Sequence, residues 1–467
     1  MAKVAVIGAG LAGLATSLFL ARRGHHVALV EKDSDPPPED AEMCFQTWAR
    51  RGVAQARQPH VLLALSSAIL RAEAPDVLDA LAEAGANFVT NTLEAVDPHR
   101  TELPFIVAAR RLVFEAVLRR KALAEANVRW LGGREASGLI LRGGADAPVV
   151  AGVTLADGEV LEADLTVDAL GRFSQTPRWL EEAGLGRPEE DFQDCGFCYM
   201  SRWYRLASGQ ARPGGLMPIF ANSRFATFYG FLADHNVFCL GMTLSMRDPL
   251  APRLREPAIF ERVLAAIPET AAWLSRAEPI SDIHILGRIE NRSRSLIKDG
   301  APLAAGLVLV GDSAMHTNPT QGRGVSMAYV QAKKLAEMLS EADPATTAFV
   351  QTFEEWRAQE LGAWFDGQAR LDAGRIAQMD AALAGAPPAP PPSDPIARFF
   401  AAVPAVARNN ADVALAFNRM MNMLITPADL ASDPVVQAAV ADHLAGGGGP
   451  PPLTGPTREA FVSLTAG

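Results

Sequence analysis

The chain has 467 residues, which is enough for two or three domains, and its 49% hydrophobic and 21% charged residues are typical of a globular enzyme. The net charge of −10 argues against nucleic acid or an anionic membrane as the main partner. No apolar run reaches the length of a membrane span and no signal peptide is recognisable, so we expect a cytoplasmic protein.

The first predicted elements are a strand, a glycine turn, a helix and a second strand within residues 3–31. The turn has a G-x-G-x-x-G pattern made by Gly8, Gly10 and Gly13. In such a turn the first glycine permits the bend, the second admits a pyrophosphate and the third lets the helix pack closely on the sheet. Glu31 ends the second strand, where an acid can accept hydrogen bonds from a ribose. The unit predicts a dinucleotide site.

Three prolines make residues 33–40 a loop. An amphipathic helix is predicted near residues 67–84, and another helix begins near Arg111. Residues 128–165 alternate apolar and polar side chains between glycine turns, which predicts a β-meander. A further apolar strand, 165–168, leads into the sequence Asp-Ala-Leu-Gly-Arg-Phe-Ser.

Residues 195–245 contain ten aromatic side chains, including three of the four tyrosines, and predict an antiparallel sheet in a second domain. Cys195 and Cys198 form a CxxC pair, but no second pair or nearby histidine completes a metal shell. Residues three apart in a strand also point to opposite faces. We therefore read these cysteines as buried strand residues and predict no metal site.

Helices are expected near residues 258–266 and 269–275. A short apolar strand, 307–310, then runs into Gly-Asp-Ser-Ala-Met-His and a proline–glycine turn. Long helices follow from about 324 to 340 and from about 345 to 370. The remainder is helical apart from two breaks, a stiff proline-rich segment at 386–393 and a flexible glycine–proline segment at 446–452.

Three stretches that lie far apart in the sequence carry the chemistry: the glycine turn, the segment 168–174 and the segment 311–324. The third is the most specific, because a buried strand delivers Asp312 at its carboxyl end, where open α/β sheets bind ligands. The following turn leads into a helix start that offers N–H donors to an anionic group.

Together the three stretches resemble the FAD-dependent monooxygenases typified by para-hydroxybenzoate hydroxylase and squalene epoxidase, over roughly residues 1–345. The resemblance implies an α/β fold with a Rossmann-like FAD-binding domain, residues 1–180 and 280–345. An antiparallel-sheet substrate domain would comprise residues 85–110 and 190–280. The helical region 346–467, with its Pro/Gly-rich breaks, lies outside the resemblance and could cover the substrate, dock a partner or form a dimer.

The resemblance also implies roles for individual residues. The three glycines would hold the FAD pyrophosphate, and Glu31, followed by Lys32, the adenosine ribose. Asp312 would bind the ribityl or phosphate-linked part of FAD. The turn from Gly322 to Gly324 would lie under the isoalloxazine. Further contacts are expected from Arg111, in an Arg-x-x-Phe-Glu pattern, and from Arg57 or Gln58 over the flavin edge.

The second stretch departs from the pattern of many hydroxylases, which have Asp-Gly here. Leu170 stands at the position of that acid, with Asp168 two residues earlier. This weakens the expectation that NADPH or NADH docks transiently as the electron donor. A partner reductase that supplies reduced flavin is the other possibility. The chain has no second strand–GxGxxG–helix unit that would store a nicotinamide cofactor.

The reaction implied is transfer of one oxygen atom from O2, through a flavin C4a-hydroperoxide, to a largely apolar aromatic or alkene small molecule in secondary or catabolic metabolism. The substrate would rest on the aromatic strands opposite Pro319. His60 and His316 are candidates for proton transfer by their nearness to the motifs alone. The sequence does not decide between hydroxylation and epoxidation, nor does it give the oligomeric state.

Three alternatives stay open. A reductase of isoprenoid double bonds similar to geranylgeranyl reductases would share the cofactor motifs but act without O2. A protein that binds FAD without catalysis would consume no NAD(P)H. A flavin halogenase would carry a Trp-x-Trp-x-x-Pro segment, and this sequence has none.

Overall fold

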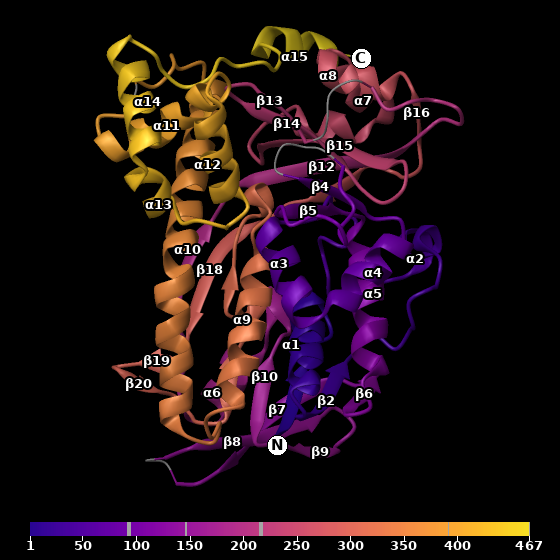
Figure 1. Ribbon diagram of the computed structural model, residues 1–467, viewed down its shortest axis with the longest axis vertical. Helices are drawn as coiled ribbons and strands as arrows, with labels where there is room; N and C mark the ends of the chain where they lie inside the picture. The colour runs from indigo at the N-terminus through magenta and orange to yellow at the C-terminus, as the bar shows by residue number, and fades with distance from the viewer. Residues whose placement is uncertain (91–94, 145–146, 214–217, 391, 467) are drawn as a thin grey trace.

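A computed structural model describes residues 1–90, 95–144, 147–213, 218–390 and 392–466. Figure 1 shows a lower part built on a parallel sheet, an upper part built on an antiparallel sheet, and a long helix, α10, along both. Within the described residues, no helix combines the length and apolar character needed to cross a bilayer.

The parallel sheet has five strands in the order β21 (Leu307–Leu309), β10 (Leu165–Asp168), β1 (Lys3–Ile7), β2 (His26–Glu31) and β6 (Val128–Gly132). Alternating side chains of β1 fill two cores. Val4 and Val6 pack against the helices, whereas Ala5 and Ile7 pack against a small antiparallel sheet on the other face. The helices are α1 (Leu11–Arg22), α5 (Arg111–Ala124) and α9 (Gly324–Leu339). The small sheet consists of β7 (Ala136–Arg142), β8 (Val149–Leu155) and β9 (Val160–Glu162).

The upper sheet is antiparallel and has the order β13 (Ile219–Asn222), β14 (Ala226–Leu232), β15 (Val237–Ser245), β12 (Phe197–Leu206) and β16 (Ala277–Pro279), with β17 (His284–Leu286) also paired to β12. Its apolar face is covered by α7 (Pro257–Ala265), α8 (Pro268–Leu274) and α15 (Arg458–Thr465). The predicted antiparallel sheet and both predicted helices after it are therefore present.

Shorter elements complete the fold. One three-stranded sheet contains β3 (Val61–Leu62), β5 (Phe105–Ala108) and β4 (Asn87–Thr90), and another contains β11 (Glu189–Asp194), β18 (Glu290–Ser295) and β22 (Met315–His316). A two-stranded sheet pairs β19 (Ile297–Lys298) with β20 (Ala301–Pro302). The short helices here are α2 (Ala41–Thr47), α3 (Ala64–Glu73), α4 (Pro75–Glu83) and α6 (Thr176–Glu182).

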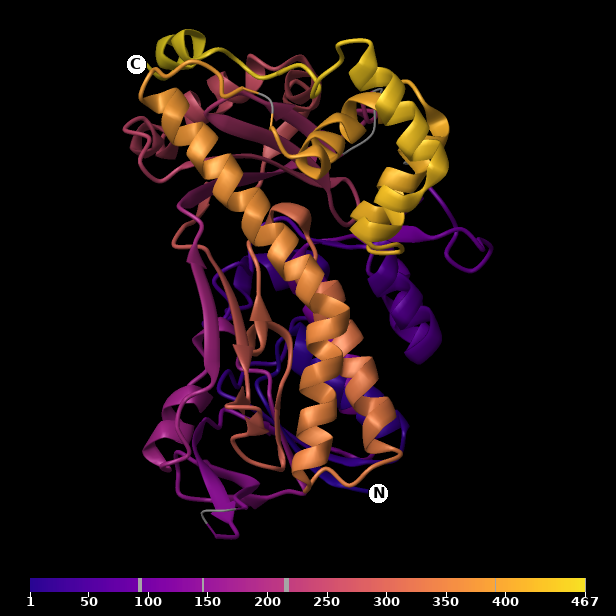
Figure 2. The ribbon, with the colours of Figure 1, turned by 90° about the vertical axis from the view of Figure 1, so that its left-hand side faces the viewer.

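Helix α10 (Thr347–Leu383) has 37 residues and so runs roughly 55 Å. Figure 2 shows it rising from the end of the parallel sheet near the N-terminus to the antiparallel sheet near the C-terminus. Beside it lie α11 (Pro395–Ala407), α12 (Ala411–Met421), α13 (Pro427–Ser432) and α14 (Pro434–Ala445). Asn422, which follows α12, accepts from the Ala64 N–H at 3.1 Å and so caps α3 from a distant part of the chain.

Several predicted boundaries were wrong. The single helix predicted at 67–84 is two helices, because Pro75 lacks the N–H that a continuous helix would use and instead starts α4. The first strand of the predicted meander, β6, pairs in parallel with β2 and belongs to the large sheet. Helix α10 extends past the predicted end at 370. The segment after the glycine–proline break, for which no element was predicted, contains α15, and its Phe461 is fully buried against the antiparallel sheet.

Candidate functional site

The glycine turn has the geometry that its sequence predicts. Gly8 has φ of +99°, and a Cβ at this position would lie 2.5 Å from the carbonyl oxygen of Ala169. A Cβ at Gly13 would lie 1.8 Å from the carbonyl oxygen of Gly8. Gly10, by contrast, has no atom within 4 Å of such a Cβ. Gly8 and Gly13 therefore allow close contact between backbone segments, whereas Gly10 faces open space at the start of α1.

Glu31 is buried at the carboxyl end of β2 and already holds the turn. Its Oε2 accepts from the Ala9 N–H at 2.9 Å and from Arg50 at 3.0 Å, and its Oε1 accepts from the Asp33 N–H at 3.0 Å. A carboxylate can accept about four hydrogen bonds. The acid thus retains acceptor capacity at Oε1 for a ribose hydroxyl.

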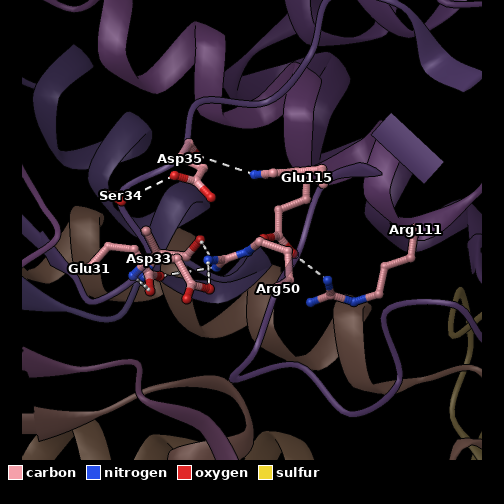
Figure 3. A network of polar contacts seen from close by, with 9 residues as sticks. Glu31, Asp33, Ser34, Asp35, Arg50, Arg111 and Glu115 are labelled. Carbon is pink, nitrogen blue, oxygen red and sulfur yellow. Dashed lines mark hydrogen bonds and ion pairs between the residues drawn. The ribbon is translucent and has the colours of Figure 1, made fainter. Parts of the chain in front are cut away.

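Arg50 lies at the centre of a buried charge cluster (Figure 3). Its guanidinium pairs with Glu31, with Asp33 at 2.6 Å and with Glu115, which is fully buried and also pairs with Arg111. Arg50 further donates to the Ala9 carbonyl oxygen at 3.1 Å. The cluster therefore connects the glycine turn to the start of α5.

The charges in this cluster depend on one another. Burial alone would raise the pKa of Glu31, but the attraction and hydrogen bond of Arg50 hold that pKa below its ordinary value. Burial works against the charge of Arg50 as well, yet Glu115 and Glu31 raise the pKa of its guanidinium above the ordinary range. The Rossmann acid is thus kept ionised by an arginine that we did not single out from the sequence.

The carboxyl ends of β1, β10 and β21 meet at one edge of the parallel sheet, where Ile7 is paired with Asp168 and Asp168 with Leu309. Asp168 is completely buried, and it accepts from Ser174 at 2.5 Å and from Ser313 at 3.0 Å. It therefore ties the second stretch to the third inside the protein. Leu170, by comparison, is half-buried at the same edge.

Asp312 lies at this edge beside the first turn of α9, with its Oδ1 3.9 Å from where a Cβ on Gly324 would lie. Its Oδ2 is 3.4 Å from Nδ1 of His316. Burial would raise the pKa of Asp312, but His316, Arg111 and Arg172 together lower it, so the carboxylate is charged. The buried Nε2 of His316 has no hydrogen-bond partner in the described part of the chain.

The turn before α9 adopts a sharp backbone bend, with Gly322 at a φ of +66° in the left-handed region. A Cβ there would lie 3.9 Å from Leu63 and 4.0 Å from Val61, which are the residues just after His60. Pro319 begins the turn and is exposed. His60 is thus a neighbour of the stretch that contains Asp312, His316 and the predicted turn, although the two lie about 250 residues apart in the chain.

Two other predicted contacts lie differently. Arg57 donates its Nε to the Phe45 carbonyl oxygen at 3.2 Å, so its guanidinium is directed toward α2. Gln58 is buried and receives a hydrogen bond from Ser201 of β12 at 2.9 Å. Both residues, with Arg50 and His284, line a cavity of about 360 Å³ between this loop and β17. Lys32 is exposed next to Gly52.

His60 is expected to remain neutral from about pH 5 to 8. Burial and Arg111 lower its pKa to about 4, with a smaller opposing effect of the Gln58 carbonyl and Asp312. This folded pKa is below the unfolded value of about 6.5, so the unfolded chain binds the proton more tightly. The contribution of His60 to the free energy of unfolding therefore falls as the pH drops from about 6.5 to 4. NMR of 13C-histidine-labelled, flavin-free protein, assigned with His60→Gln, would test this. A titration midpoint near 6.5 would contradict it.

The residues present fit FAD. The open side of Gly10 gives a pyrophosphate access to the N–H groups of α1, and α9 offers a second helix N-terminus at the same sheet edge. Spare acceptor capacity at Glu31 suits a ribose. The orphaned Nε2 of His316 gives a buried polar atom beside Asp312 for a further hydrogen bond.

Comparison with known proteins agrees with this site. The family model described as FAD dependent oxidoreductase matches residues 3–176. A 6-methylpretetramide 4-monooxygenase of Streptomyces rimosus is 27% identical over 350 residues, which cover 72% of this chain and 75% of the relative.

Two solved structures share the fold. OxyS anhydrotetracycline hydroxylase from Streptomyces rimosus has a TM-score of 0.58 and 16% identity, over 91% of this chain and 76% of that one. The flavin-dependent brominase Bmp2 has a TM-score of 0.62 and 14% identity, over 95% and 99%. The chain therefore gathers its three motifs at one edge of the parallel sheet, is similar to the FAD dependent oxidoreductases over residues 3–176, and shares its fold with these two flavin enzymes.

Proposed function

We propose that the protein is an FAD-dependent monooxygenase that inserts one atom of O2 into a largely apolar aromatic or alkene small molecule. The observation that carries this proposal is the meeting of the three motif stretches at the edge of the parallel sheet that faces the antiparallel sheet. The 6-methylpretetramide 4-monooxygenase relative supports the same reaction class.

The residues that would hold FAD follow from the site. The N–H groups after Gly10 would bind the pyrophosphate, and Glu31 would bind the adenosine ribose. Arg111 and Asp312 would contact the middle of the cofactor. The turn from Gly322 to Gly324 would lie beneath the ring system. When bound, FAD supplies the reaction with O2 and the transfer of oxygen to the substrate.

The protein's own contribution is to bind the substrate, orient it and exclude water. Tyr199 of β12 donates to Asn318 just before the Pro319 turn, so the aromatic sheet lies directly against that turn. Most of its aromatic side chains, such as Phe228 and Phe238, are buried in the core behind this surface. Those at the turn would form the wall of the substrate site.

The proposal has two forms, which differ in the source of the electrons that reduce the flavin. NADPH or NADH would act as a transient donor, docking without a nicotinamide-binding domain, or a partner reductase would deliver reduced flavin. The apolar Leu170 at the strand edge supports the second route. The cavity beside Arg57 offers a positively charged approach for the first.

The experiment starts from purified protein loaded with FAD. Anaerobic mixing with NADPH, NADH or dithionite shows which donor reduces the flavin. A panel of aromatic and polyene compounds is then incubated with reduced enzyme and 18O2, and mass spectrometry follows the products. One 18O atom in the product is the expected result. A saturated product formed without O2 would instead identify a double-bond reductase, and failure to bind FAD would overturn the proposal altogether.

A further inference from the structure

Asp372 is a buried carboxylate on α10, outside all three motif stretches. Its side chain is surrounded by neutral donors from three other parts of the chain and from α10 itself. Oδ1 accepts from Asn318 at 2.8 Å, from Gln368 at 2.9 Å and from Thr320 at 3.4 Å. Oδ2 accepts from Asn291 at 2.8 Å and from the Cys195 thiol at 3.8 Å. Burial raises the pKa of this carboxyl group above its ordinary value, and the hydrogen bonds from these side chains oppose the rise by favouring the ionised form.

The two asparagine amides present their NH2 groups to Asp372. The carbonyl oxygen of Asn318 accepts from the Tyr199 hydroxyl, which leaves its NH2 group for Asp372. The carbonyl oxygen of Asn291 accepts from the backbone N–H of Asn318 at 2.8 Å, so its NH2 group must face Asp372 too. A backbone N–H can only donate, so it fixes the orientation of the Asn291 amide, and a donor at the Oδ2 position of Asp372 would meet the NH2 group of Asn291.

These contacts converge on the turn that leads into α9. Asn318 and Thr320 flank Pro319, and both are bound by Asp372. Arg323 of the same turn is buried against Trp364 of α10, with its guanidinium 4.7 Å from the ring centroid. Burial lowers the pKa of Arg323 to about 10, and the charge of Asp372 acts in the opposite direction. Helix α10 therefore contacts this turn through the carboxylate of Asp372 and the ring of Trp364.

We infer that Asp372 is a positioning residue that fixes the Pro319–Gly324 turn for flavin binding, acting through Asn318 and Thr320. The inference rests on the proposed function, because that function gives the turn its role beneath the flavin ring. If Asp372 has this role, the helical region after residue 345 helps to shape the cofactor site. In its ionised form, Asp372 beside this turn would in addition disfavour reduction of the flavin.

The central test compares Asp372→Asn with Asp366→Asn, an exposed residue on the same helix that loses the same charge. Melting temperature, FAD Kd by fluorescence quenching and the midpoint potential of bound flavin are measured for each. Asp372→Asn is expected to weaken FAD binding about tenfold, the effect of about one misplaced buried hydrogen bond. Its flavin potential should become more positive. Asp366→Asn should match the parent in both properties.

A complementary exchange makes the test independent of simple instability. In the double variant Asn318→Asp, Asp372→Asn, the new carboxylate can accept from Tyr199 and from the new amide, while the amide oxygen still accepts from Asn291. Gln368, which donates to Oδ1 in the parent, must turn its amide so that its oxygen faces the new NH2 group. This variant should recover most of the lost FAD affinity, even where Asp372→Asn alone fails to fold.

Two results would overturn the inference: FAD affinity and potential in Asp372→Asn equal to those of Asp366→Asn, or a double variant no better than the single one. Absence of FAD binding by the parent chain would instead overturn the proposed function, so the two failures are distinguishable.

Discussion

Replacing Gly13 with alanine is expected to destabilise the protein by about 3 kcal/mol or more. In an isolated helix this change would gain about 1 kcal/mol, because alanine is the better helix former. Here the added Cβ would lie 1.8 Å from the backbone carbonyl oxygen of Gly8, an atom that cannot move without displacing β1 or the turn. Overpacking against backbone costs more than the helix propensity gains. Urea unfolding of the flavin-free protein would measure the loss.

Gly10→Ala is the matched control, since it adds the same methyl group three residues earlier. Gly10 has an extended backbone that alanine adopts readily, and its Cβ would meet nothing within 4 Å. The flavin-free stability should therefore change by less than about 1 kcal/mol. FAD affinity should nevertheless fall about 100-fold, because the methyl group would occupy the approach of the pyrophosphate. Equal destabilisation by the two substitutions, or unchanged FAD binding in Gly10→Ala, would contradict this assignment.

Arg50→Met is expected to cost about 3–5 kcal/mol near pH 7, because it leaves buried carboxylates without their shared cation. Glu31 and Asp33 would lose their ion pairs, at 3.0 and 2.6 Å, whereas Glu115 would keep Arg111. Methionine replaces the aliphatic part of arginine, so the substitution removes the guanidinium with its charge and its hydrogen bonds, including the one to the Ala9 carbonyl oxygen. Urea unfolding at pH 7.5 and at pH 5 would measure the effect.

The pH dependence has a definite sign. In the parent, the lowered pKa of Glu31 contributes stability that is present above its unfolded value of about 4.3 and lost as the pH falls through the folded pKa. Without Arg50, burial dominates and raises the folded pKa, so the carboxylate becomes protonated at higher pH. The deficit of Arg50→Met should therefore shrink on acidification. Arg134→Met, which breaks the more exposed pairs with Asp157 and Glu159, should change little. A deficit that grows toward pH 5 would contradict the argument.

The cofactor motifs could be predicted because local sequence fixes their geometry. The spacing of Gly8, Gly10 and Gly13 between two apolar strands specifies both a turn and a close helix–sheet contact, and the structure has both. Apolar runs such as 307–310 predicted a buried strand for the same reason. The incorrect boundaries lay where the local sequence does not show which strand or helix a segment packs against. The alternation in β6 is compatible with either kind of sheet, and only pairing with β2 decides it.

Arg50 and Asp372 show what the sequence did not reveal. Neither stands in a recognisable pattern, because the spacing of an arginine or an acid does not say which distant groups will surround it. Arg50 gains its role from Glu31 and Glu115, which lie 19 and 65 residues away along the chain. Asp372 gains its role from donors 54 and 81 residues away.

The sequence by itself therefore predicted a dinucleotide site, because short-range geometry specifies the glycine turn, and its resemblance to a flavoprotein family predicted FAD as the cofactor. Only the tertiary structure decided which buried charges keep Glu31 ionised and which helix holds the turn before α9. Burial and ion pairing depend on neighbours brought together by folding, and the energy of a charge inside a protein is set by those neighbours rather than by its own position in the chain.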